Sequence, residues 1–209
     1  MGRLKKNQTK NYRFEIKYLM KILAGVDEVG RGSLIGPVYA AAVILNKSIN
    51  QKLLKDSKSL NKNKREELDK YIKKNSIWAI GQASTKEIEK INILHASLLA
   101  MKRAILKLKK KPSLVLIDGN KIPDLKNYKL EFVIKGDQKI SSISAASIIA
   151  KVSRDKFITK LSKQFNNYGW DTNSGYGTKE HLKAIKRFGI TKHHRKTFSP
   201  ISDFYKLHV

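Results

Sequence analysis

The chain contains no cysteine, which excludes disulfides and any zinc site built on thiolates. A metal site would therefore need carboxylate or histidine ligands. Long apolar runs are absent too, since no stretch approaches the roughly 20 apolar residues that a membrane span requires. The N-terminal segment has the basic charge of a secretion signal, but Lys17 and Lys21 interrupt what would be its apolar region. We expect a cytoplasmic protein that binds no membrane.

Acidic residues are scarce and basic residues are abundant. The 209 residues include 17 acids against 44 lysines and arginines, which gives a formal net charge of +27. Such an excess favours a polyanionic partner, nucleic acid before an anionic membrane surface. A general lysine bias of the genome would produce the same excess, so charge alone leaves the partner open.

The pattern of apolar residues predicts an α/β fold, with a mixed five-stranded sheet flanked by helices and a small helical C-terminal subdomain. The link between the first two strands is shorter than a parallel crossover needs, so we expect these strands to pair antiparallel. Asn61 and Thr178 are suited to cap two of the helices, and we expect Trp78 and Trp170 in the core. The expected strands are 21–26, 38–45, 77–85, 113–118 and 129–136, and the expected helices are 59–75, 92–111, 138–165 and 179–187.

The length allows one main core and is short for two full domains. Residues 1–11 are polar and basic, so we expect a tail there. Residues 12–165 carry the expected strands and long helices of the main domain. Residues 166–209 are rich in turns, aromatic residues and basic residues, which predicts the helical subdomain.

Three of the expected strands have an acidic residue at or directly after their carboxyl end, close to a glycine. Asp27 and Glu28 follow "AGV", Asp118 follows "LVLI", and Asp137 follows "FVIKG". In open α/β sheets, ligands bind at the carboxyl ends of the strands, so these acids would converge if the strands are neighbours. Taken singly, Asp137 could instead cap a helix and Asp118 could belong to a turn.

A cluster of carboxylates would need to take up protons or bind a cation. Two like charges about 4 Å apart repel by roughly 4 kcal/mol at an effective dielectric near 20. Oxygen ligands select a hard ion such as Mg²⁺ or Mn²⁺, and such ions in a basic protein suggest two-metal phosphodiester hydrolysis. One geometric condition applies: neighbours in an ideal strand face opposite sides, so Asp27 and Glu28 meet only at a strand end or bulge.

A glycine-rich loop follows the first pair of acids. Gly30, Gly32 and Gly36 do not form the dinucleotide-binding fingerprint, because Ile35 stands where its third glycine should fall. Two glycines around Arg31 offer close backbone approach, uncovered N–H donors and a guanidinium. A tight loop between paired strands would account for the glycines but not for the arginine.

Several long motifs in one order resemble ribonuclease HII, the type 2 ribonuclease H family. The opening signature is "AGVDEVGRGSLIGPVYAAAVIL", and the resemblance extends from about residue 12 to residue 200. The further motifs are "DSKSL" at 56–60, "NILHASLLAM" at 92–101, "LIDGN" at 116–120, "KGDQKISSISAASIIAKVSRD" at 135–155, "GYGTKEH" at 175–181 and "HHRKTF" at 193–198.

The resemblance implies a ribonuclease H-like fold and an endonuclease that cuts RNA in RNA/DNA hybrids or at a ribonucleotide embedded in duplex DNA. Its products would carry 3′-hydroxyl and 5′-phosphate ends. The family's metal ligands fall on Asp27, Glu28 and Asp118, which would hold Mg²⁺ or Mn²⁺, and its fourth active-site aspartate falls on Asp137. Residues 12–165 would form the catalytic domain of a monomer, and residues 166–209 would complete the substrate site.

The resemblance also implies how substrate is bound. The loop of Gly30, Arg31 and Gly32 would contact the 2′-hydroxyl at the junction of RNA and DNA, the group that distinguishes the two sugars, and Tyr176 would stack on the adjoining sugar. Lys58 resembles a family lysine near the substrate and is expected to contact a phosphate. His193, His194 and Arg195 resemble a phosphate-contacting cluster, and these three residues could equally belong to a solvated tail.

The chain departs from the family pattern at three positions. Ser33 and Gly177 stand where proline is usual, and Ser59 stands where lysine is common. Because glycine fixes the backbone less than proline, Gly177 could loosen Tyr176 and weaken junction selectivity. Two rival hypotheses remain: a basic nucleic-acid-binding module without catalysis, and an enzyme of the type 3 group, which is expected to lack the glycine-arginine-glycine loop.

Overall fold

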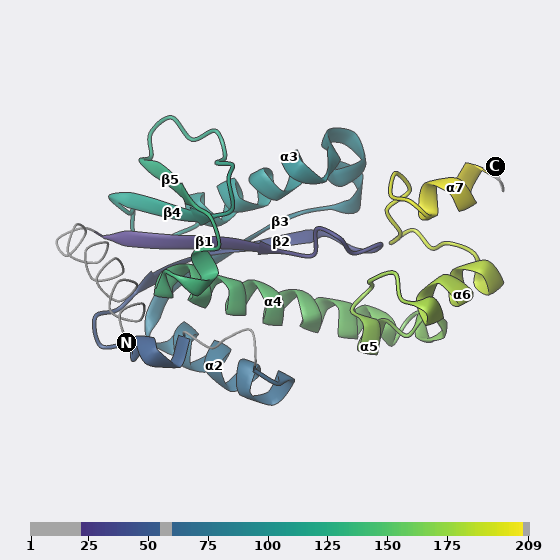
Figure 1. The fold of residues 1–209 in the computed structure, drawn as a ribbon, viewed down its shortest axis with the longest axis horizontal. Coiled ribbons are helices and arrows are strands. Elements are labelled where there is room, and N and C mark those ends of the chain that lie inside the picture. The colour runs from purple at the N-terminus through teal and green to yellow at the C-terminus, as the bar shows by residue number, and fades with distance from the viewer. Residues whose placement is uncertain (1–21, 55–59, 207–209) are drawn as a thin grey trace, which may run out of the picture.

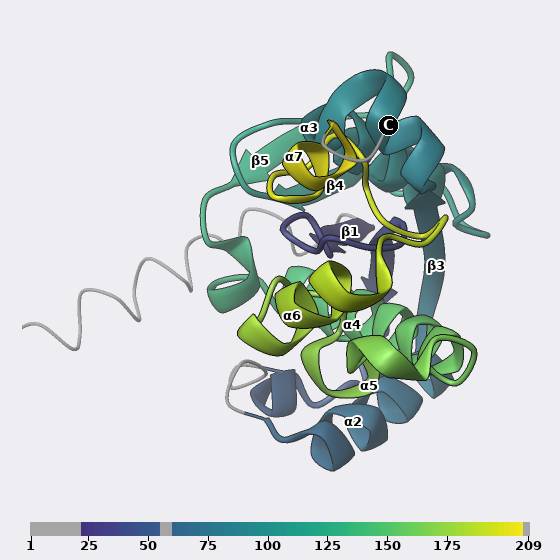
Figure 2. The same ribbon diagram turned by 90° about the vertical axis from the view of Figure 1, so that its right-hand side faces the viewer.

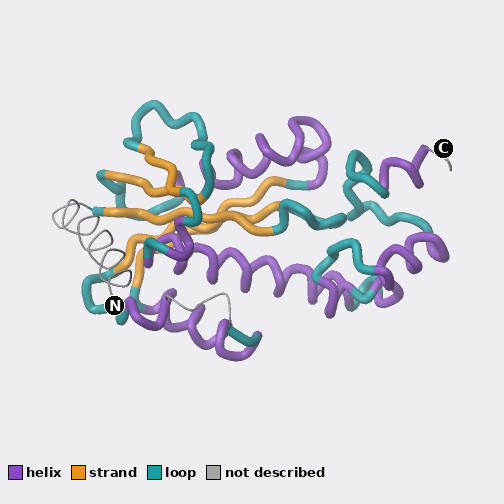
Figure 3. Tube along the Cα trace, in the orientation of Figure 1, coloured by secondary structure: helices purple, strands orange, loops and turns teal. Residues whose placement is uncertain are grey.

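The computed structural model describes residues 22–54 and 60–206, and its centre is a mixed five-stranded sheet, as predicted (Figures 1 and 3). The strand order is β3-β2-β1-β4-β5. β1 pairs antiparallel with β2, which confirms the expectation from the short link, and parallel with β4. The strands are β1 (Leu23–Val29), β2 (Val38–Leu45), β3 (Ser76–Ala83), β4 (Leu114–Asp118) and β5 (Leu130–Val133).

Helices cover both faces of the sheet. α3 (Thr85–Leu106) lies on one face and α4 (Ser141–Ser162) on the other, with α2 (Lys62–Lys74) packed beside α4 (Figure 1). Glycines let both long helices approach closely. A Cβ on Gly25 of β1 would lie 2.1 Å from the Ser142 backbone of α4, and one on Gly81 of β3 would lie 2.1 Å from the Ala100 carbonyl oxygen of α3.

Local capping explains where several helices begin. The Asn61 side chain accepts a hydrogen bond from the Lys64 N–H, and the Thr178 side chain accepts one from the His181 N–H, so both predicted N-caps are confirmed. The helix expected at 92–111 begins earlier, at Thr85, and ends at Leu106. Asn92, with φ of 61°, interrupts it, and its Oδ1 accepts from the Leu94 N–H to restart the helix.

The C-terminal part has a core of its own around Trp170, which is fully buried as predicted. Leu34 and Ile35, from the loop after β1, pack into this core, so the opening segment and the C-terminal helices share one cluster. Figure 1 shows the C-terminal helices at one end of the molecule, the end that faces the viewer in Figure 2. The further elements are η1 (Gln51–Leu54), η3 (Gly136–Gln138), η4 (Asn166–Tyr168), α5 (Trp170–Asn173), α6 (Lys179–Phe188) and α7 (Ile201–Lys206).

The prediction for Trp78 is wrong, because this side chain lies at the surface with 36% of its area exposed. Its Nε1–H donates to the Lys73 carbonyl, and the Lys73 ammonium lies 5.0 Å from the ring centroid. The indole therefore packs on the end of α2 instead of entering the core. Among the described residues, none of the helices combines the length and apolar character needed to cross a bilayer.

Gly81→Ala should destabilise the fold, because its methyl group would collide with the α3 backbone and force the helix away from the sheet. We expect the free energy of unfolding to fall by roughly 1–3 kcal/mol, the cost of overpacking a core. Urea unfolding measures this change. Gln82→Ala, at the exposed next position of β3, is the matched control and should change the free energy by less than about 0.5 kcal/mol. Equal stability of the two variants would contradict the close packing.

Candidate active site

β1 and β4 place two acids side by side at the carboxyl ends of adjacent strands. Their parallel pairing ends with Val26 opposite Ile117, so Asp27 and Asp118 are the next residues along each strand. Residues at the same level of parallel strands project to the same face. The charge of Asp118 raises the pKa of both Asp27 and Glu28, so the three carboxyls lie within electrostatic reach of one another.

Asp27 has a strongly raised pKa. Its side chain is buried against α4, and this burial raises its pKa well above the ordinary value, with the charges of Glu28 and Asp118 adding to the effect. Two donors oppose the shift: the Glu28 N–H, 2.7 Å from Oδ1, and the Ser147 hydroxyl of α4. Asp27 therefore retains its proton to a higher pH than an exposed aspartate.

Glu28 lies inside β1, so strand alternation turns its Cα–Cβ bond away from that of Asp27. Its position next to the last residue of the strand and its longer side chain still bring the carboxyl within range of Asp118. Burial is the main cause of its raised pKa, and Arg31 opposes it. The Arg31 Nη1 lies 3.2 Å from Glu28 Oε1, so this ion pair joins the acids to the glycine-rich loop.

The fourth acid follows a tight turn beside Asp118. The Gly136 N–H donates to Asp118 Oδ1 over 2.6 Å, and the buried Asp137 is the next residue. The N-cap residue of α4 is Ile140, directly before Ser141, and it makes no side-chain cap, so the alternative that Asp137 merely caps this helix is wrong. All four acids predicted from the sequence therefore lie at one edge of the sheet.

The donor set suits a hard divalent cation, because it consists of carboxylate oxygens whose mutual repulsion a cation would relieve. Within residues 22–54 and 60–206, no three acid or histidine side chains form a ready ion-binding group. The Gly136 N–H holds one oxygen of Asp118, and Arg31 pairs with one oxygen of Glu28, so each of these carboxylates has one oxygen bound to a donor.

The loop after β1 lies beside Tyr176. Gly30 has φ of 92° and a Cβ there would meet Arg154, so this position requires glycine. Arg31 and Gly32 are exposed, and a Cβ on Gly32 would lie 3.9 Å from the Tyr176 ring. The fold thus places the loop, the acids and this tyrosine at one site.

The comparisons with known proteins agree with this geometry. A sequence model of the family described as Ribonuclease HII matches residues 24–201. The chain belongs to the ribonuclease HII family. The ribonuclease HII of Pelagibacter ubique is 92% identical over 184 residues, which cover 88% of this chain and 99% of the relative. It follows that the protein is an enzyme, a nuclease of the ribonuclease H type.

Solved structures share the fold. The ribonuclease H2 of Pyrococcus horikoshii has a TM-score of 0.74 at 28% identity, over 90% of this chain and 98% of that one. Bst-RNase HIII has a TM-score of 0.69 at 18% identity, over 88% of this chain and 69% of that one. Because the type 3 enzyme shares the architecture, the fold alone does not separate the two types. The family match over residues 24–201 does.

His194 and Arg195 of this enzyme are buried, so the alternative of a solvated tail is wrong. Arg195 donates to the carbonyl oxygens of Arg31, at 2.8 Å, and Gly36, at 3.0 Å. Burial and the charge of Arg154 lower its pKa to about 9, which leaves it protonated at neutral pH. Burial lowers the pKa of His194 to about 3, so it is neutral there. The Arg195 side chain holds the loop from inside, whereas the His194 ring contacts Thr191 and His181, and the His194 backbone forms a bridge with Ile35. Lys58 lies outside the described residues.

Three residues near the site were missed by reasoning from the sequence. Ser147 donates to Asp27, Arg154 binds the loop, and His181 contacts the Tyr176 carbonyl oxygen through Nδ1 at 2.9 Å. The Trp170 Nε1–H donates to Nε2 of His181, which places the imidazole proton on Nδ1. A signal for Arg154 existed: it is a charged residue seven positions after Ser147, on the same face of a helix expected to pack on the sheet.

Asp27→Asn should stabilise the protein at neutral pH. The raised pKa means that the folded state resists ionisation of this carboxyl, so stability falls as pH rises above about 3.9, the value in the unfolded chain. Asparagine removes the charge, and we expect a gain of roughly 1 kcal/mol at pH 8 that shrinks towards zero at pH 4. Urea unfolding across this range measures it. Asp124→Asn, at an exposed site, is the control, and a gain independent of pH would contradict the assignment.

Proposed function

We propose that this enzyme is an endoribonuclease that hydrolyses the RNA strand of RNA/DNA hybrids and incises at ribonucleotides embedded in duplex DNA. The products would carry 3′-hydroxyl and 5′-phosphate ends. One observation carries the proposal: the mutually repelling acids Asp27, Glu28 and Asp118 lie beside a loop whose exposed Gly32 lies near the Tyr176 ring. Cleavage chemistry and sugar recognition would thus occupy one site.

Asp27, Glu28 and Asp118 are the residues that would hold the Mg²⁺ or Mn²⁺ ions of a two-metal mechanism. When bound, such ions stabilise the charge on the attacking and departing oxygens of the phosphodiester. The protein supplies carboxylates that are already desolvated and crowded. Burial raises the pKa of Asp27 most, the charges of Glu28 and Asp118 raise it further, and a cation would lower it by stabilising the ionised form. We assign Asp137 to assist at the second ion or at the departing group.

The exposed loop would recognise the sugar. With no side chains at positions 30 and 32, the backbone can approach a 2′-hydroxyl closely, and Tyr176, with 37% of its area exposed, can stack on the adjoining sugar. The Arg31 guanidinium, now paired with Glu28, is available for a phosphate or sugar oxygen if that acid turns towards an ion. The burial of His194 and Arg195 leads us to assign them to support of the loop.

The large basic excess favours attraction of the polyanionic substrate, because 44 basic residues face 17 acids. Lys58 stays a predicted phosphate contact. We propose further that the enzyme acts as a monomer in the cytoplasm.

Asp118→Asn should lower cleavage of both an RNA/DNA hybrid and a DNA duplex with one embedded ribonucleotide by about 10³-fold or more, because it removes a charged metal ligand. Single-turnover cleavage with Mg²⁺, with Mn²⁺ and with a chelator measures this, and the chelator should abolish cleavage by the unmodified enzyme. Asp124→Asn removes the same charge from the exposed loop after β4 and should keep full activity. Undiminished cleavage by Asp118→Asn would overturn the assignment.

Arg31→Ala should reduce cleavage at the single embedded ribonucleotide more than cleavage of the uniform hybrid, since the hybrid presents many equivalent positions. We expect the ratio of the two values of kcat/KM to fall about tenfold, the effect of one lost charge-assisted hydrogen bond. Arg31→Lys keeps the charge but not the planar fork, and should give an intermediate ratio. An unchanged ratio in Arg31→Ala would remove Arg31 from recognition.

A further inference from the structure

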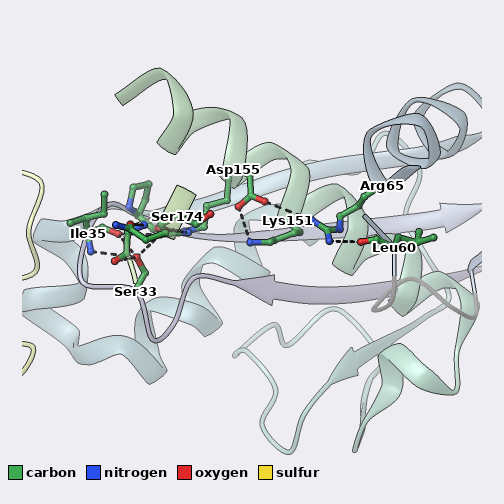
Figure 4. Close-up of polar contacts among 11 residues, drawn as sticks. Ser33, Ile35, Leu60, Arg65, Lys151, Asp155 and Ser174 are labelled. Carbon is green, nitrogen blue, oxygen red and sulfur yellow. Dashed lines mark hydrogen bonds and ion pairs between the residues drawn. The ribbon is translucent and has the colours of Figure 1, made fainter. Parts of the chain in front are cut away.

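Arg154 of α4 is fully buried, and its guanidinium binds the loop after β1. Nη2 donates to Ser33 Oγ at 2.7 Å and to the Ile35 carbonyl oxygen at 3.2 Å, and Nη1 donates to the Ser174 carbonyl oxygen at 3.1 Å. Figure 4 shows Ser33, Ile35 and Ser174 drawn together by these contacts. One buried cation therefore ties the loop to the segment that carries Tyr176.

Ser33 makes the second half of this connection. Its hydroxyl lies 3.0 Å from the Gly175 carbonyl oxygen and 3.1 Å from that of Ile35, so it donates its one proton within this pair while accepting from Arg154. The Leu34 N–H donates to the same Gly175 oxygen over 2.9 Å. All of these groups lie in a buried layer beneath the exposed loop.

The two joined backbones continue directly into the recognition residues. Ser33 follows Gly32, and Gly175 precedes Tyr176. The hydrogen bond from the Ser33 hydroxyl to Gly175 therefore joins the two residues that are the direct neighbours of Gly32 and Tyr176. Packing leaves little room for adjustment, since a Cβ on Gly175 would lie 2.3 Å from the Ile35 side chain. The Arg154 Cζ also lies 5.9 Å from the centroid of the Tyr176 ring.

We propose that Ser33 is a positioning residue: with Arg154, it fixes the separation between the Gly32 backbone and the Tyr176 ring, and so sets selectivity for a single ribonucleotide. This inference rests on the function proposed above. Ser33 and Gly177 both stand where proline was expected, and proline would restrict the backbone through its ring. Here the hydroxyl supplies the restriction through hydrogen bonds.

Amide hydrogen exchange tests the connection without any need for activity. Ser33→Ala removes the hydroxyl and should speed exchange roughly tenfold both in residues 30–37 and in residues 174–178, which are far apart in sequence. Ser153→Ala is the matched control, because it removes a hydroxyl of α4 that has no hydrogen-bond partner in the structure. It should leave both segments unchanged. Exchange in 174–178 that is unaffected by Ser33→Ala would overturn the proposal, whether or not the enzyme cleaves either substrate.

Kinetics test the consequence for selectivity. Ser33→Ala should lower kcat/KM at the single embedded ribonucleotide about tenfold relative to the uniform hybrid, while Ser153→Ala keeps the ratio of the unmodified enzyme. Ser33→Thr, which retains the hydroxyl, should recover most of the ratio. If the unmodified enzyme cleaved neither substrate, the proposed function would fail, and the part of the proposal that concerns selectivity would fail with it. Equal ratios in Ser33→Ala and the unmodified enzyme would overturn the positioning role alone.

Discussion

The close contact between α4 and the segment that begins with β1 is the constraint on which the site depends. Gly25 lacks the side chain that would hold the helix away, so the backbone of α4 reaches the strand. From that point, one face of the helix follows the segment: Ser147 reaches Asp27, Arg154 reaches Gly30 and Ile158 reaches Gly36. Asp27 and the loop are therefore both positioned by one helix.

The distribution of charge around the site follows from the scarcity of acids. The carboxylates of Asp27, Glu28 and Asp118 are crowded together on β1 and β4. The buried arginines bind carbonyl oxygens instead: Arg195 binds two in the loop, and Arg154 binds one in the loop and one at Ser174. Burial lowers the pKa of both guanidinium groups, and their hydrogen bonds to the protein offset part of the cost of burying the charge. The acids, for their part, keep oxygens that a cation could use.

Local patterns in the sequence were enough to predict most of the elements and the proximity of the acids on β1 and β4. Strands, the antiparallel pairing of β1 with β2, and two helix caps follow from the period of apolar residues, from loop length and from residues such as Asn61. Acids at strand ends were visible because they interrupt apolar runs. The ion pair of Glu28 with Arg31 depends on how far the two side chains extend, which the spacing of residues in the sequence does not predict.

The errors and omissions have a common physical origin in tertiary packing. Trp78 has a largely apolar side chain but faces outward, because β3 lies at the edge of the sheet and the Lys73 carbonyl of α2 accepts a hydrogen bond from the indole N–H. His194 and Arg195 look like a basic tail, yet a bridge between Ile35 and His194 draws them inside. The role of Arg154 depends on which turn of α4 meets the loop, and this register emerges only in the folded chain.

The buried arginines hold the loop mainly by its main-chain carbonyls, groups that every amino acid possesses. Most side chains of that loop can therefore change during evolution without loss of these carbonyl bonds. Gly30, where a Cβ would meet Arg154, and Ser33, whose hydroxyl accepts a further bond from Arg154, are exceptions. Insertions and deletions are different, because a single added residue would move each carbonyl away from its guanidinium. Variation in this region among relatives should accordingly be confined to substitutions at constant length.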